Sequence, residues 1–190
     1  MKGVSLRNYP SVLASLRGEH LTERMMSLLP EELREGLRTG GITATAWYPV
    51  SWKRELHRAG ALATGEAHLA RTMGREMTLR DLNGIYRAFM RLVSPPTVLQ
   101  AGARIFSTYL RPGKYQVAEV RDGFVRVEFT QCYGFDPNMW LDVLGGCEAV
   151  LEAAGAQSVR LRIESGGREG DSACSAIAWW TGDVPPLGPP

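Results

Sequence analysis

Residues 114–130 read KYQVAEVRDGFVRVEFT and open the part of the chain that decides the fold, Lys114 to Thr181. Two runs of alternating apolar and polar residues flank Asp122-Gly123, and an Asp-Gly pair in this setting is a strong β-hairpin signal. A type I′ turn, with positive φ at both central residues, is therefore predicted. Side chains alternate along a strand, so one face of the second run should be buried. That face comprises Val125, Val127 and Phe129.

A helix is predicted to follow the hairpin. Asp136 is a natural N-cap, and Pro137 suits the first helical position, where its missing N–H costs nothing. Apolar residues then recur at helical spacing as far as Gly155, which we expect to end the helix in the left-handed conformation. This stripe comprises Trp140, Val143, Leu144, Cys147, Leu151 and Ala154.

Two more strands complete the pattern. Residues 159–164 alternate apolar with charged side chains, residues 165–172 form a polar, Gly-rich loop, and residues 173–181 form the last strand. One sheet crossed by one amphipathic helix needs further cover on its inner face. We therefore predict an α+β fold in which N-terminal helices pack on a C-terminal ββαββ four-stranded antiparallel sheet.

The first half of the chain is predicted to be mostly helical. Short helices are expected at residues 11–17, 21–28 and 31–38, a short extended segment at 42–48, and further helices at 51–62 and 65–75. Thr78-Leu-Arg-Asp is a loose capping box, expected to open a helix whose stripe is Leu82, Ile85, Tyr86, Phe89 and Val93. Ser94-Pro-Pro should open the next helix, with these residues facing inward: Val98, Ile105, Phe106 and Tyr109.

Composition limits the classes of function. A chain of 190 residues with 44% hydrophobic residues and a net charge of +2 fits one globular unit, and it has no long basic run that would indicate nucleic-acid binding. We expect a helical segment over 1–41, an α+β ligand- or partner-binding domain over 42–183 that forms one unit with it, and a Pro-rich tail over 184–190. No membrane span or signal peptide is recognised, so a cytoplasmic location is expected. Three widely spaced cysteines indicate reduced thiols.

The order of elements resembles the fold shared by heme–nitric-oxide-binding domains, vinyl-reductase-like sensor domains and small subunits of the TRAPP tethering complex. At the level of sequence the chain resembles a myxobacterial paralogous family of short bacterial proteins of unknown function. Two stretches carry that resemblance, ITATAWYPVSWKREL at Ile42–Leu56 and WLDVLGGCEAVLEAAGAQSV at Trp140–Val159. It implies a domain that binds heme, an aromatic effector, a lipid chain or a protein partner.

The chain departs from these resemblances at two places. Heme-binding relatives need an axial histidine on a helix that faces the sheet; the candidates, His57 and His68, lie on charged helical stretches more typical of surface residues. The sensor relatives hold zinc with a cysteine pair around the last hairpin. Cys174 falls at the second of these positions, but residues 164–165 at the first are Glu and Ser. No metal ligand and no cofactor are therefore predicted.

Two groups of residues are candidate sites. An aromatic set either lines a ligand pocket between helices and sheet or forms ordinary core: Trp47, Tyr48, Trp52, Tyr86, Phe89, Phe106, Tyr109 and Trp140. Arg126, Arg160 and Arg162 should share the outer sheet face, as a solvated ion-paired surface or a docking face for an acidic partner. Cys147 is expected in the core, and Cys132 and Cys174 could approach each other at the sheet ends.

No catalytic signature rises above background, so no catalytic residue is assigned. We expect a non-enzymatic cytoplasmic binding or regulatory module that acts through protein partners; a homodimer and a small apolar ligand remain open. The alternative is a sensor domain that binds a small apolar or aromatic ligand between helices and sheet, with heme less favoured because the histidine pattern is missing.

Overall fold

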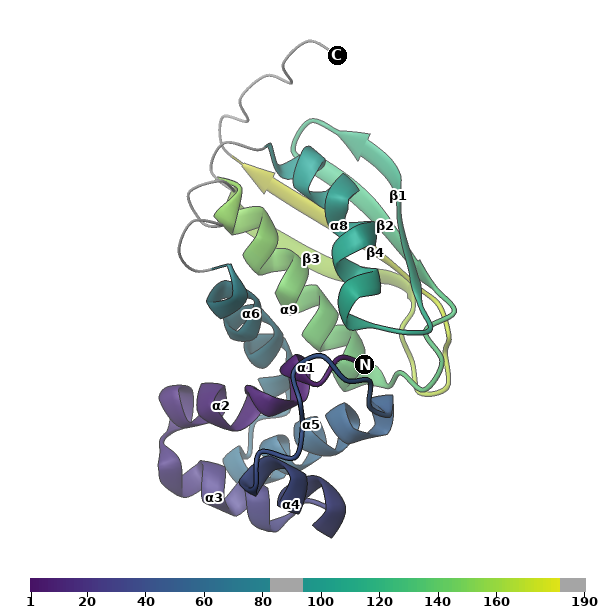
Figure 1. Ribbon diagram of the computed structural model, residues 1–190. Helices are drawn as coiled ribbons and strands as arrows, with labels where there is room; N and C mark the ends of the chain where they lie inside the picture. The colour runs from purple at the N-terminus through teal and green to yellow at the C-terminus, as the bar shows by residue number, and fades with distance from the viewer. Residues whose placement is uncertain (83–93, 182–190) are drawn as a thin grey trace.

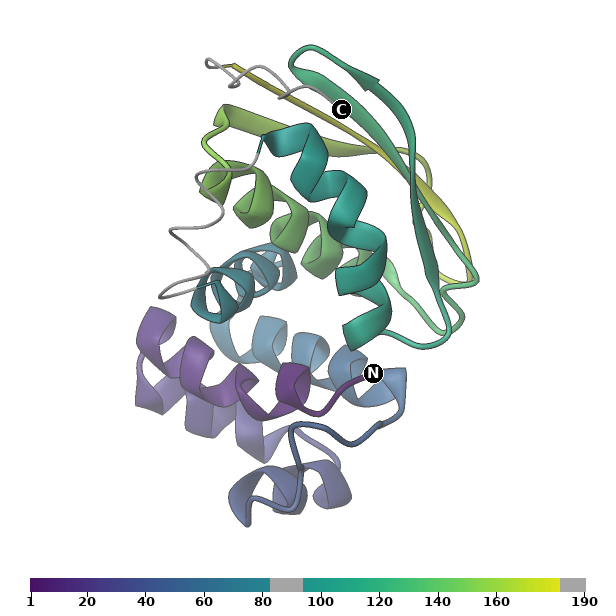
Figure 2. The same cartoon turned by 45° about the horizontal axis from the view of Figure 1, so that its top comes forward.

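The computed structural model describes residues 1–82 and 94–181. A four-stranded antiparallel sheet in the order β1-β2-β4-β3 lies at one side of the molecule (Figure 1). The strands are β1 (Lys114–Arg121), β2 (Phe124–Thr130), β3 (Gln157–Gly166) and β4 (Cys174–Thr181). Helices α8 (Pro95–Tyr109) and α9 (Pro137–Ala153) cover one face of this sheet (Figure 2). The predicted α+β fold with a ββαββ sheet is confirmed.

The hairpin forms where it was predicted, but its turn differs. Strands β1 and β2 pair from Lys114 opposite Thr130 to Arg121 opposite Phe124, and the face with Val125, Val127 and Phe129 is buried. Gly123 takes a positive φ of 64°, while Asp122 does not adopt positive φ. The type I′ prediction is therefore wrong. A non-glycine residue pays a steric cost at positive φ, and here the turn needs only its glycine there.

Local signals set the ends of the two helices that cover the sheet. The Asp136 carboxylate accepts a hydrogen bond from the backbone N–H of Met139 at 2.8 Å, as expected of an N-cap, which contributes about 1 kcal/mol. After Ala154, Gly155 takes φ 93° and ends α9 as predicted. Helix α8 begins after Ser94 as predicted, and Val98 and Phe106 face inward. Ile105, also predicted to face inward, is 44% exposed because it lies on the flank of the stripe.

The remaining described helices form further layers below α9 (Figures 1 and 2). They are α1 (Val4–Arg7), α2 (Tyr9–Arg17), α3 (Glu19–Ser27), α4 (Glu31–Arg38), α5 (Val50–Thr64) and α6 (Leu69–Asp81). Helices were predicted at the places of α2 to α5, with ends that differ by a few residues. The segment predicted as extended, 42–48, joins no sheet; it forms an isolated bridge between Trp47 and Lys2 and further backbone hydrogen bonds to the first residues of the chain.

The prediction that Thr78 opens a helix is wrong. Thr78 lies in the last turn of α6, which continues through the weak helix predicted at 65–75 and ends at Asp81. Tertiary packing overrides the local capping signal, because α6 packs closely against α9, and Thr78 itself lies against Gly146 of α9. Apart from Leu82, which is the C-cap of α6, the apolar stripe predicted beyond Thr78 lies outside the described residues.

Two glycines let α6 and α9 approach until their backbones touch. A Cβ added at Gly74 would lie 2.0 Å from the carbonyl oxygen of Asp142, and one added at Gly145 would lie 2.0 Å from that of Arg71. Real Cβ atoms do not approach backbone so closely, so only glycine fits at either position. This contact fixes where α9 presents its side chains toward the sheet and toward α5.

Among the described residues, no helix combines the length and the apolar character needed to cross a bilayer.

Candidate functional site

A cavity of about 210 Å³ lies between the helices and the sheet. Most of its wall comes from α6, α8 and α9, and the strands contribute Tyr115 and Phe129. The lining is mostly apolar, with side chains such as Leu99, Phe106 and Val143. For scale, a dry apolar cavity of about 150 Å³ in another protein binds benzene. The space is therefore suited to a small, mainly apolar molecule.

A buried polar cluster lies at one end of this cavity. The Lys53 ammonium group on α5 lies 3.3 Å from Oδ1 of Asp142 on α9, and both residues line the cavity. Lys53 is 1% exposed and also donates to the Ser5 carbonyl oxygen at 3.3 Å. His57, one turn further along α5, places Nε2 3.4 Å from the same Asp142 oxygen. The cluster thus joins the N-terminal helices to α9 by charge as well as by packing.

Burial and charge act in opposite directions on this cluster. Burial alone would raise the pKa of Asp142, but Lys53 and His57 outweigh it and hold the pKa below its ordinary value. Burial lowers the pKa of His57, and the opposing effect of Asp142 is smaller. His57 is therefore neutral near pH 7. When the imidazole of His57 carries its proton on Nε2, this N–H points toward Asp142. Nδ1 then accepts a hydrogen bond from the Tyr9 hydroxyl, 3.2 Å away.

A buried neutral histidine makes stability depend on pH. In the unfolded chain His57 binds a proton as the pH falls through about 6.5, whereas the folded protein resists protonation there. We expect the free energy of unfolding to fall as the pH drops below about 6.5, and His57→Gln to reduce that slope. Denaturant titrations at pH 7.5, 6.5 and 5.5 measure the effect. The matched control is His68→Gln at an exposed histidine, and an unchanged slope in His57→Gln would contradict the assignment.

A second polar pair lines the cavity at its α6–α8 edge. The Tyr109 hydroxyl donates to Oδ2 of Asp81 at 3.3 Å. Burial, with Asp81 nearby, raises the pKa of Tyr109 to about 12, and burial also raises the pKa of Asp81. The Tyr109 hydroxyl therefore stays protonated and hydrogen-bonded to Asp81.

The structure brings together only part of the predicted aromatic pocket. Phe106 and Tyr109 line the cavity, and Tyr86 and Phe89 lie outside the described residues. Four residues predicted for the pocket, Trp47, Tyr48, Trp52 and Trp140, are not among its lining. The Tyr48 ring stacks on that of Trp52, with their centroids 5.2 Å apart. The Lys2 and Arg111 cations lie over the ring of Trp47. Trp140 is buried against Phe129 and Phe135. Those aromatic groups pack the core and the N-terminal layer instead.

The histidines and cysteines also differ from expectation in part. His57 is 1% exposed, so its assignment to the surface is wrong; His68 is exposed. Cys132 and Cys174 are buried free thiols, and burial raises the pKa of Cys132 to about 11, which disfavours the reactive thiolate. Cys147 is half-buried on α9 and lines the cavity. Within residues 1–82 and 94–181, no three His, Cys, Asp or Glu side chains are grouped to hold a metal ion.

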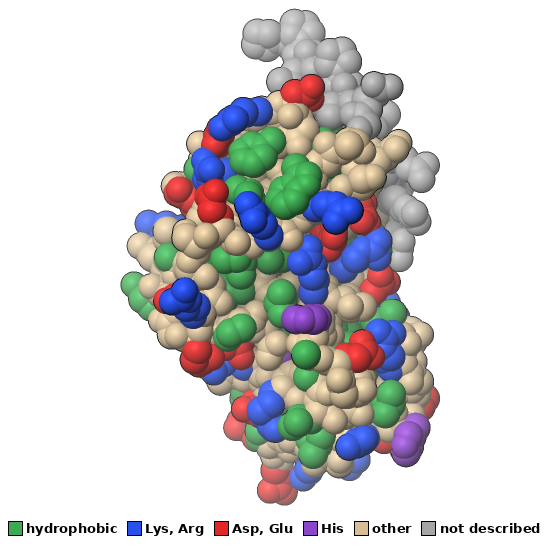
Figure 3. All heavy atoms as spheres, turned by 180° about the vertical axis from the view of Figure 1, so that it is seen from behind, with side chains coloured by type: hydrophobic (Ala, Val, Ile, Leu, Met, Phe, Trp, Pro, Cys, Tyr) green, Lys and Arg blue, Asp and Glu red, His purple; other side chains and the backbone are tan. Residues whose placement is uncertain are grey.

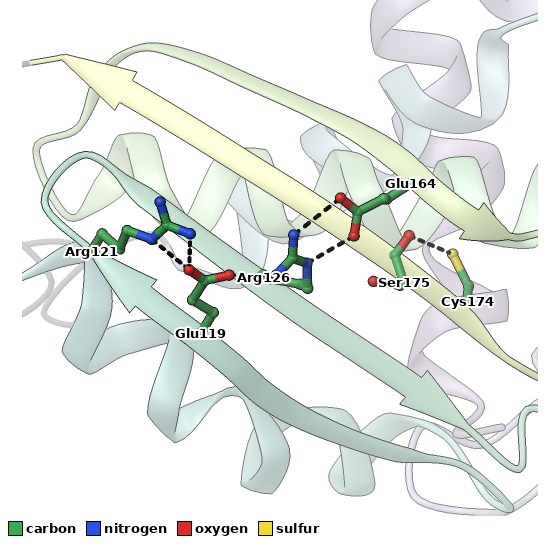
Figure 4. A network of polar contacts seen from close by, with 6 residues as sticks. All are labelled: Glu119, Arg121, Arg126, Glu164, Cys174 and Ser175. Carbon is green, nitrogen blue, oxygen red and sulfur yellow. Dashed lines mark hydrogen bonds and ion pairs between the residues drawn. The ribbon is translucent and has the colours of Figure 1, made fainter.

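Of the three arginines predicted to share the outer sheet face, Arg126 lies on β2 and Arg160 and Arg162 lie on β3, with β4 between the two strands. Arg126 donates to Glu164 at 2.7 Å and also pairs with Glu119 (Figure 4). In the described part of the chain, Arg160 and Arg162 make no ion pair, and Arg162 lies 5.8 Å from the ring of Trp179, which is 37% exposed. Figure 3 shows hydrophobic side chains on this face with Lys and Arg side chains around them. Docking of an acidic partner here stays a prediction.

Sequence reasoning missed the buried cluster. Lys53 and His57 are one turn apart on α5, and their shared face with Leu56 and Gly60 was a signal that both could be buried. Nothing in the sequence paired them with Asp142, which lies more than eighty residues away and was assigned no role.

No family model matches the sequence, and no curated protein matches it. Solved structures do match. The H-NOX protein from K. algicida, crystallised as Fe(II) unliganded, has a TM-score of 0.73 at 14% identity, covering 96% of this chain and 98% of that one. An H-NOX protein from S. oneidensis in the Fe(II)NO ligation state has a TM-score of 0.70 at 9% identity, with 96% and 100% covered. An oxygen-binding H-NOX domain related to soluble guanylate cyclases, solved as its oxygen complex, gives 0.66 at 14%, with 100% of both chains covered. The chain therefore has an H-NOX-like fold.

Proposed function

We propose that this H-NOX-like domain is a sensor that binds a small, mainly apolar or aromatic molecule in the cavity between α6, α8, α9 and the sheet. The observation that carries the proposal is the cavity itself, about 210 Å³ with mostly apolar walls and a few polar groups at its edges. Binding sites for small molecules combine such walls with a small number of placed polar groups.

The residues present do not fit a heme held by an axial histidine, the arrangement expected of the heme-binding relatives. The sequence contains only three histidines, and none of them lines the cavity. His57 is fully buried with its two ring nitrogens facing Tyr9 and Asp142, and His20 and His68 are exposed. Thiolate and phenolate can also hold heme iron. Burial raises the pKa of both Cys147 and Tyr109 to about 12, which disfavours those forms.

We further propose that ligand binding changes the interaction of the domain with a protein partner, and that the domain has no catalytic activity of its own. Two features support this: burial raises the pKa of the Cys147 thiol and of the Tyr109 hydroxyl at the cavity wall, which disfavours their nucleophilic forms, and the outer sheet face carries Arg160 and Arg162 beside an exposed Trp179.

A cavity-filling variant tests the sensor proposal. The probe is α-methylstyrene, a small apolar aromatic, and the readout is the midpoint of thermal unfolding. We expect the probe to stabilise the wild type by about 2.7 kcal/mol at a hundred times its Kd. Val143→Phe places a ring in the cavity and should abolish the shift, because Val143 is part of the wall.

The matched control is Val120→Phe, at a position that is 40% exposed on β1, and it should keep the full shift. Absence of stabilisation in the wild type, or an unchanged shift in Val143→Phe, would refute binding in this cavity. Addition of hemin to the purified protein is expected to give no Soret band that survives dialysis, and a surviving band would show that heme binds after all.

A further inference from the structure

The Tyr115 side chain is a buried group of the cavity whose hydroxyl has no hydrogen-bond partner in the described part of the chain. Tyr115 is on β1, is 8% exposed and lines the cavity. Its ring lies 5.2 Å from that of Phe129 and 6.3 Å from that of Phe106. Within the described residues, its hydroxyl makes no hydrogen bond. The great majority of buried polar side-chain atoms have a partner, so this hydroxyl calls for one that residues 1–82 and 94–181 do not supply.

The helix opposite Tyr115 leaves room for the ring. A Cβ added at Gly102 on α8 would lie 2.9 Å from the ring and 3.2 Å from its hydroxyl oxygen. Glycine at this position costs helix stability, about 1 kcal/mol relative to alanine in a helix interior. In return it lets the phenol lie against α8 at the cavity wall.

The chemistry of the hydroxyl defines what could pair with it. Burial, with Cys147 nearby, raises the pKa of Tyr115 well above its ordinary value, so the phenol stays protonated. A protonated phenol donates one hydrogen bond. The side chains around it are apolar, chiefly Phe106 and Phe129, and a charged group placed there would lose its hydration without an opposite charge. A neutral hydrogen-bond acceptor is therefore the matching group.

We infer that the Tyr115 hydroxyl recognises the ligand by donating a hydrogen bond to a neutral acceptor oxygen. The ligand class is an apolar or aromatic molecule that carries one carbonyl oxygen. The inference rests on the proposed function, since it names the ligand chemistry of the same cavity. The ionisable groups at the wall already have partners: Tyr109 pairs with Asp81, and Asp142 pairs with Lys53 and His57.

Two probes of the same shape test the inference. Acetophenone and α-methylstyrene differ only in an oxygen that replaces a CH₂ group, and the Kd of each is measured by calorimetry for the wild type and for Tyr115→Phe. The variant keeps the ring and removes the hydroxyl. We expect its Kd for acetophenone to rise about tenfold, the equivalent of one buried hydrogen bond, and its Kd for α-methylstyrene to stay within about twofold. Tyr133→Phe, at a tyrosine that is 61% exposed, should change neither Kd.

The outcomes separate this inference from the proposed function. If Tyr115→Phe changes both Kd values by the same factor, or changes neither, the hydroxyl does not recognise the oxygen and the inference fails, while binding of the probes to the wild type still supports the sensor. An internal water that satisfies Tyr115 would give that result. If neither probe binds the wild type, the sensor proposal fails, and this inference fails with it.

Discussion

Asp142→Ala is expected to lower the free energy of unfolding by about 3–5 kcal/mol, because it leaves the Lys53 ammonium group buried without a counter-charge. Removing one partner of a buried ion pair costs far more than the pair itself contributes, since the remaining charge keeps its desolvation penalty. Urea titration at pH 7 measures the change.

The double variant Lys53→Met, Asp142→Leu distinguishes the charge from the packing. It removes both charges and keeps apolar volume at both positions, so most of the lost stability should return. A double variant as unstable as Asp142→Ala would mean that the shape of these side chains, and not the charge, holds α5 to α9. The exposed pair of Arg58 and Glu55 on α5 is a reference: Glu55→Ala should cost less than about 1 kcal/mol.

Gly145→Ala is expected to cost about 3 kcal/mol of folding free energy, at the upper end of the usual cost of overpacking. The added methyl group would lie 2.0 Å from the Arg71 carbonyl oxygen, a backbone atom that moves only if α6 and α9 separate. Thermal and urea unfolding report the loss. It should also widen the neighbouring cavity, because both helices form its walls.

The next residue provides the control for that prediction. A methyl group at Gly146 would meet the Thr78 hydroxyl at 3.0 Å, and this hydroxyl can rotate away. Gly146→Ala should therefore be neutral or stabilising, because alanine is the better helix former by about 1 kcal/mol. Similar losses in the two variants would show that the backbone contact at Gly145 is not decisive.

The elements that could be predicted from the sequence are those set by neighbouring residues. Asp136-Pro137 starts α9 and Gly155 ends it, and the Asp-Gly pair closes the hairpin, because in each case the stabilising contact lies within a few residues. The prediction that a helix begins at Thr78 was wrong for the opposite reason. Its capping signal is local, whereas the continuation of α6 depends on packing against α9, a helix far along the chain.

The candidate site was predicted less well than the fold. The aromatic character of the cavity wall was expected, and Phe106 and Tyr109 are part of it. Trp47 and Trp52 were placed in the pocket because aromatic residues near a proline suggested one, yet no periodicity indicates which layer such a cluster joins. The unpaired hydroxyl of Tyr115 could not be foreseen, since being unpaired depends on every neighbour that fails to supply a partner.

The backbone contact between α6 and α9 has a mechanical consequence for the cavity. Two helices that touch through Gly74 and Gly145 form a stiff frame, because neither can slide without a clash. Helix α8, by contrast, meets α9 and β1 through side chains, which can change rotamer. A bulky ligand should therefore displace α8 rather than the α6–α9 pair. The position of α8 on the sheet would then depend on the size of the bound ligand.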